Sequence, residues 1–127
     1  MIKHVESMRR VPGMLAATRA IAVISLPWSP WPRKSREVLA VLEQNRVKWS
    51  PAVPVEFFDL WPEQEDELHR WYEQLCEQYA PRLELHGHGY GPLWWLAKGV
   101  VLDCLYKPYE LPAEQLQQHS QVVFEGA

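Results

Sequence analysis

Residues 28–36 read Trp-Ser-Pro-Trp-Pro-Arg-Lys-Ser-Arg and stand where a predicted strand gives way to a predicted helix. The run before them, 20–26, is continuously apolar and rich in β-branched residues, which is typical of a central strand covered on both faces. Residues 33–45 have the pattern of an amphipathic helix, and Pro32 suits its first turn, because an amide there has no intrahelical acceptor. The residues expected on the buried side of this helix are Val38, Leu39, Val41 and Leu42.

Downstream of this helix, strands and helices continue to alternate. Strands are expected at 55–60, 93–97 and 100–106, and helices at 63–79 and 113–122, with 46–54 as a loop that has room for a short strand. Lys98-Gly99 is a tight-turn signal that joins the last two strands into a hairpin. Alternating strands and helices indicate a parallel βαβ portion, to which this hairpin adds an antiparallel edge.

The N-terminal residues 1–19 are predicted to form a helical arm. Met8, Val11 and Leu15 recur at steps of three and four, as on one side of a helix running from His4 to Thr18 with a break at Pro12-Gly13. A chain of 127 residues has the length of one domain. We therefore expect residues 1–127 to form a single domain that begins with this arm.

Composition and charge exclude several classes of protein. With 47% hydrophobic and 23% charged residues, the chain is globular rather than disordered. The net charge of -3 and the scattered basic residues argue against a nucleic-acid partner, which needs clustered Lys and Arg. Arg33, Lys34 and Arg36 are the one small basic patch, and we expect them to form a solvated face.

The expected location is the cytoplasm, with no membrane partner. The apolar run at 20–26 is too short to span a bilayer and is needed as a strand. Cys76 and Cys104 are the only two cysteines, and both fall in segments that favour small buried core residues. Buried free thiols suit a reducing compartment.

Two local motifs in this order of elements resemble those of the thioredoxin family. Residues 28–36 are similar to the family's redox loop, in which W-C-x-x-C-[KR] follows a strand and opens a helix. Gly91-Pro92, the apolar strand after it and the turn at Lys98-Gly99 are similar to the family's cis-proline, strand and turn. The resemblance covers about 20–123. It implies a thioredoxin-like three-layer α/β sandwich, with a mixed sheet of four to five strands and helices on both faces.

When the family's motif is compared residue by residue with this sequence, the residues that carry the family's usual chemistry are replaced. Trp31 takes the place of the tryptophan before the first cysteine, Pro32 and Ser35 take the two cysteine positions, and Pro92 takes that of the cis-proline. Disulfide exchange needs a thiolate, which neither proline nor serine supplies. We therefore expect no dithiol oxidoreductase activity, no catalytic residue and no cofactor. Gly91 departs from the family, which usually has Ile, Thr or Val there.

A thioredoxin-like fold without these cysteines can still bind other molecules through its surface. In the family, the cis-proline loop lies beside the redox loop and offers backbone groups to an extended peptide, and tryptophan is enriched at interface hot spots. We expect a redox-inactive module with an aromatic groove that holds a protein or peptide partner, or a second copy of this chain as a homodimer. The residues expected in this groove are Trp28, Trp31, Pro32, Ser35, Tyr90, Gly91 and Pro92.

Two alternatives stay open. Some thioredoxin-fold glutathione transferases resemble this arrangement, with a serine near the helix start that stabilises a thiolate ligand, and Ser35 suits that role. Those enzymes also need an extra helical domain for which the chain is too short. His86 and His88 form an H-x-H pair that suits a metal, but a site needs three or four ligands. The ordinary interpretation of Ser35 is a small polar residue in a helix. The ordinary interpretation of His86 and His88 is two exposed histidines in a loop.

Overall fold

The computed structural model describes residues 1–5, 8–24, 31–50, 52–60, 70, 92–105 and 107–125. The elements, in chain order, are β1 (Ile2–Val5), η1 (Met8–Arg10), α1 (Val11–Leu15), β2 (Ala20–Ile24), α2 (Trp31–Gln44), α3 (Arg46–Trp49), β3 (Glu56–Leu60), β4 (Leu93–Ala97), β5 (Val100–Leu105), η3 (Pro108–Glu110) and α5 (Ala113–Glu125). The helix expected at 63–79 lies outside these residues, except that Arg70 is helical.

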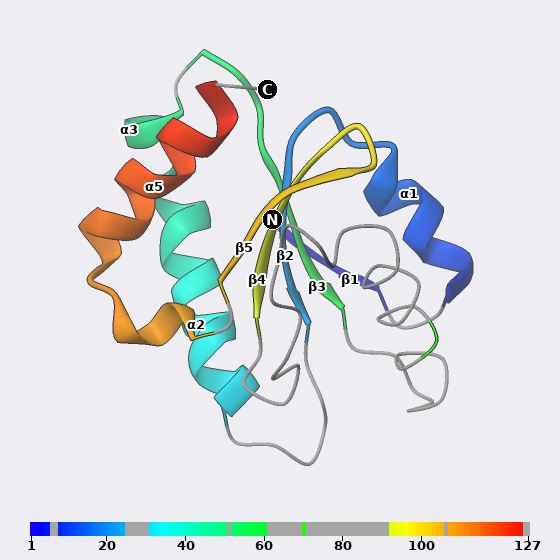
Figure 1. Cartoon of the computed structure of the whole chain (residues 1–127), viewed down its shortest axis with the longest axis horizontal. Helices are drawn as coiled ribbons and strands as arrows, with labels where there is room; N and C mark the ends of the chain where they lie inside the picture. The colour runs from blue at the N-terminus through cyan, green and yellow to red at the C-terminus, as the bar shows by residue number, and fades with distance from the viewer. Residues whose placement is uncertain are drawn as a thin grey trace.

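The strands form one mixed sheet in the order β1-β3-β2-β4-β5. β1 and β2 run parallel to β3, whereas β4 runs antiparallel to β2 and to β5. Helices α2, α3 and α5 cover one face of the sheet and α1 lies on the other (Figure 1). The predicted α/β sandwich, with helices on both faces of a mixed sheet, is therefore confirmed.

The prediction of a helical arm is wrong at its beginning. Residues Ile2–Val5 form an edge strand, and the helical turns begin only at Met8. Ile2 packs into the core on the α2 side of the sheet and Val5 into the core on the α1 side. Successive residues of a strand point to opposite faces, so two apolar residues three positions apart pack in opposite cores. The same spacing places two residues on one side of a helix, which is why the sequence pattern alone suggested a helix.

The segment expected as a loop at 46–54 contains a short helix, α3, held by one tryptophan. Trp49 is buried, and its indole N–H donates to the carbonyl of Leu42 at 2.8 Å. Its ring lies edge-on to Phe57, with the centroids 6.3 Å apart. Burial of this large side chain, with its polar atom satisfied, fixes the chain between α2 and β3.

Each face of the sheet has its own apolar core. Trp94 is fully buried on the α1 side and Trp95 on the α2 side, because neighbouring residues of β4 point to opposite faces. The α1-side core consists of Val5, Val11, Met14, Ala17, Ala20, Ala22, Phe58, Leu60, Trp94, Leu96 and Val101. The α2-side core consists of Ile21, Val23, Leu39, Leu42, Trp49, Val55, Phe57, Leu93, Trp95, Leu116 and Phe124. These two cores fix the sheet between its helical layers.

The predicted turn between β4 and β5 is present. Lys98 and Gly99 both have positive φ values, 50° and 80°. Positive φ at both central residues is the geometry of the two-residue hairpin turns that match the twist of their strands. Glycine is suited to the second position because it has no Cβ.

Candidate functional site

One end of the sheet brings together the described parts of the predicted groove. β2 ends at Ile24, and Val23 pairs with Leu93 in the antiparallel neighbour β4. Pro92, which precedes Leu93 and is buried, therefore lies beside the end of β2. The first turn of α2 lies at the same end of the sheet (Figure 1).

The structure places only some of the predicted groove residues. Trp31 and Pro32 are the first two residues of α2, so the proline occupies the first turn as expected. Trp28, Tyr90, Gly91 and the peptide bond before Pro92 lie outside the described residues. The aromatic groove and the cis-proline stay predictions.

Ser35 lies at the second of the two positions where the resemblance puts cysteine. It is the fifth residue of α2 and is fully buried. A hydroxyl that does not reach the surface cannot contact a dissolved thiol ligand in this conformation. The structure therefore gives Ser35 the position of a packed helix residue.

A buried carboxylate lies close to the beginning of α2. Asp59 of β3 is 2% exposed, with one oxygen 3.7 Å from Nη1 of Arg36 and 3.5 Å from Nδ1 of His4. A buried carboxylate is costly unless cations or donors compensate it. Asp59 therefore ties the first turns of α2 to the edge strand β1. The signal in the sequence was an acidic residue between Phe58 and Leu60, two apolar residues of the predicted strand 55–60, and it was missed.

The basic residues early in α2 do not form one solvated face. Arg36 is directed to Asp59, and its side chain is 30% exposed. Lys34 lies over the ring of Tyr109 in η3, with Nζ 5.8 Å from the centroid. Arg33 is exposed to solvent. Lys34 is exposed like Arg33, so the expectation of a solvated face is wrong for Arg36, which is half-buried.

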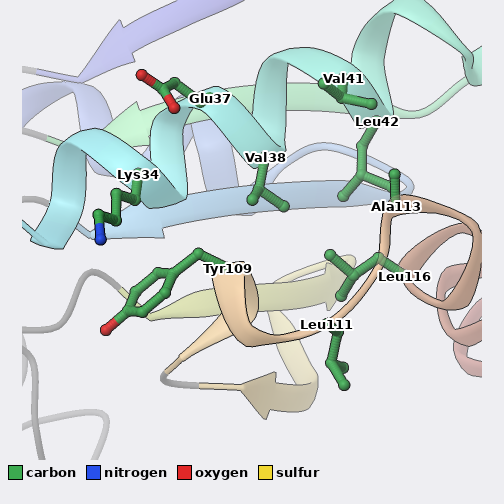
Figure 2. Close-up of a pocket in the computed structure, with 9 residues that line it drawn as sticks. All are labelled: Lys34, Glu37, Val38, Val41, Leu42, Tyr109, Leu111, Ala113 and Leu116. Atoms are coloured by element: carbon green, nitrogen blue, oxygen red, sulfur yellow. The ribbon is translucent and has the colours of Figure 1, made fainter.

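A cleft follows α2 from this end of the sheet. Its volume is about 370 Å³, and it lies between α2 and the segment formed by η3 and the beginning of α5. Figure 2 shows its residues, with Lys34 and Tyr109 at one end and Val41 and Ala113 at the other. The other residues that line it are Glu37, Val38, Leu42, Leu111 and Leu116.

The walls of this cleft are mainly aliphatic, and two of its large aliphatic side chains are exposed. Val41 is 36% exposed and Leu111 is 37% exposed. Val41 was predicted to be buried with its neighbours, and this part of the prediction is wrong. The side chain is left open because the chain opposite α2 passes as a narrow 3-10 turn and an extended residue, Leu111. Sequence periodicity predicted the apolar side of α2 but could not predict this cleft.

The described cysteine lies away from α2. Cys104 is half-buried on the edge strand β5, and its side chain packs against the core on the α1 side of the sheet. Cys76, His86 and His88 lie outside the described residues. Within the described ranges, no three metal-ligating side chains come together. The same part of the chain contains no helix long and apolar enough to cross a bilayer.

Comparison with known proteins identifies the fold. No protein-family model and no curated protein matches the sequence. Among solved structures, the chain is similar to a thioredoxin of Entamoeba histolytica carrying a cysteine-to-serine mutation, with a TM-score of 0.52 and 12% sequence identity. The match covers 100% of both chains. This likeness shows that the chain has the thioredoxin fold.

Proposed function

We propose that this thioredoxin fold serves as a module that binds a protein or peptide partner by contact, without dithiol exchange. The cleft along α2 is the observation that carries the proposal. It begins at Lys34, about one helical turn after Trp31 and Pro32. Exposed aliphatic side chains gathered in a concave surface are typical of sites that bind another molecule.

The proposal places the partner across two adjoining surfaces. One is the predicted groove at the end of the sheet, to which Trp31 and Pro92 belong. The other is the cleft, where Val41 and Leu111 offer apolar contact and Lys34 and Glu37 offer polar contacts at the margin. Apolar anchors surrounded by polar groups are the usual anatomy of a specific protein interface.

The absence of dithiol chemistry rests on residue type and position. Pro32 and Ser35 stand where the resemblance puts the two cysteines, and Ser35 is buried. Cys104 packs on the opposite face of the sheet from α2. A thiol reacts when it is exposed and ionised, and a half-buried residue of an apolar core is poorly suited to that.

The glutathione and metal alternatives have weaker support. The first needs the Ser35 hydroxyl to face a ligand, and this hydroxyl is buried. The second needs ligands beyond His86 and His88, and both histidines lie outside the described residues. Contact through the cleft and groove is therefore the function that the geometry supports best.

Capture from native cell extract tests this function. A double variant, Trp31→Ala with Tyr90→Ala, is expected to lose the partners that the unmodified chain retains on a column, because both aromatic anchors are removed. The matched control is Val122→Ala with Val47→Ala, at two exposed positions outside the cleft. Proteins retained by the unmodified chain and by the control, but not by the double variant, support the groove. If the unmodified chain, the control and the double variant retain the same proteins equally, the groove is not the binding surface.

A further inference from the structure

A second cleft lies on the other face of the sheet from α2. Its volume is about 480 Å³, and it opens between the edge strand β1 and the η1–α1 segment. Buried side chains of Val5, Met14 and Phe58 close its floor. This cleft is separate from the one along α2, because no residue in the described parts of the chain lines both.

The second cleft is basic, although the chain as a whole is acidic. The chain has 16 acidic and 13 basic residues, yet the residues lining this cleft that the structure describes include Lys3, Arg9 and Arg10 and no Asp or Glu. Lys3 lies 5.6 Å from the ring centroid of Phe58 and makes a 2.6 Å ion pair with Glu56, which offsets part of its charge. Arg9 and Arg10 are exposed. Segregated positive charge of this kind attracts an acidic partner.

The cleft borders the β1 edge of the sheet, where no further strand pairs among the residues that the structure describes. β1 is the terminal strand of the sheet, and among the described strands it pairs only with β3. The outer edge of such a strand presents backbone donors and acceptors to which an extended chain can pair. β1 is four residues long, which matches a short peptide segment.

From this edge and this charge we propose that β1 binds an extended acidic segment of a partner protein. The segment adds as a further strand beside β1, and its carboxylates face Arg9 and Arg10. Backbone pairing supplies the register, and the arginines select for acidic side chains. A peptide fits the site better than a nucleic acid, because the site combines a strand edge with a few exposed basic side chains on a chain of net negative charge.

The structure offers a clean way to fill this cleft. Gly13 lines it, and a Cβ added there would meet no atom within 4 Å. A side chain can therefore start at this position without a clash at its Cβ, and phenylalanine is the substitution chosen to fill the cleft. Alanine at the same position adds only a methyl group and improves helix propensity, so it serves as the control.

The probe is a fluorescein-labelled octapeptide of alternating Glu and Val, and its anisotropy is followed as the protein is added. We expect saturable binding that weakens as salt is raised. Arg9→Glu should weaken binding about fivefold or more, since it turns attraction into repulsion. Lys48→Glu makes the same change in net charge at an exposed position on α3 and should leave binding unchanged. Gly13→Phe should weaken binding, whereas Gly13→Ala should not.

Two further probes separate strand addition from simple charge attraction. A peptide with proline at alternate positions keeps its glutamates but lacks half of its backbone donors, so it should bind far more weakly. A single-stranded oligonucleotide of 20 thymidines should bind more weakly than the Glu-Val peptide. The proposal would be overturned if the proline peptide bound as well as the Glu-Val peptide, or if the oligonucleotide bound more tightly. It would also be overturned if Lys48→Glu weakened binding as much as Arg9→Glu, or if no peptide bound at millimolar concentration. The Trp31→Ala, Tyr90→Ala variant should bind the peptide normally, so this test is independent of the α2 cleft.

Discussion

Replacing Val41 and Leu111 together with glutamate is expected to weaken partner capture at least tenfold while the fold stays intact. Both side chains lie at the surface of the α2 cleft, 36% and 37% exposed. A partner seated there would lose apolar contact and would have to desolvate two carboxylates, and each of these effects costs on the order of 1 kcal/mol or more. Because both positions already face solvent, the free protein can hydrate the new charges.

The control for this variant has the same chemistry at other exposed valines. Val47 of α3 and Val122 of α5 are 67% and 68% exposed and do not line the cleft. Val47→Glu with Val122→Glu therefore makes the same change in net charge. Capture is measured at equal protein concentration, and thermal unfolding is followed by circular dichroism for all variants. Equal capture by both double variants would show that the α2 cleft is not the contact surface.

The second large effect is on stability, and it concerns Trp95. Replacing Trp95 with alanine is expected to lower the free energy of unfolding by about 3–5 kcal/mol, the usual cost of removing a large buried aromatic side chain. Trp95 is fully buried in β4, its indole N–H donates to Oγ of Ser120 at 3.0 Å, and its ring lies edge-on to His119 with centroids 4.8 Å apart. Since small domains are stable by about 5–15 kcal/mol, this loss removes much of the total.

Two milder variants divide this effect into packing and hydrogen bonding. Trp95→Phe keeps an aromatic ring but loses the N–H donor, and Ser120→Ala removes the acceptor while the indole stays. Each should cost about 1–2 kcal/mol, in the range for a buried hydrogen bond with a small packing change. The Ser120 hydroxyl also donates to the carbonyl of Leu116 at 2.8 Å, a bond that Trp95→Phe leaves in place. Urea titrations followed by circular dichroism measure all three, and a Trp95→Ala variant as stable as Trp95→Phe would contradict this account of the core.

The elements with the strongest local signals could be predicted from the sequence. β2, α2, β4, β5 and α5 follow from apolar runs, helical periodicity and the Lys98-Gly99 turn, and the structure confirms each of them within a few residues. β1 could not be predicted in this way. It is short, Lys3 and His4 interrupt its apolar residues, and it is a strand because it pairs with β3, more than fifty residues later in the chain.

The site was harder to predict than the fold, because it depends on contacts between distant segments. Periodicity places Val41 on the apolar side of α2 but does not reveal that the segment around Leu111 leaves it exposed. The sequence places Arg36 beside two other basic residues and so suggests a shared solvated face. In the structure, Arg36 is directed instead to Asp59 in β3. The motif at 28–36 predicted the beginning of α2 correctly.

The central claim is that this thioredoxin fold works through its surface and without sulfur chemistry, and insulin reduction tests it most directly. The purified chain is incubated with insulin and dithiothreitol, and precipitation of the reduced insulin B chain is followed by turbidity beside an active thioredoxin. Our account predicts a rate equal to that of dithiothreitol alone, because proline and serine stand at the two positions that need thiols. A rate above that blank, retained after repurification and abolished in Cys76→Ser or Cys104→Ser, would contradict it.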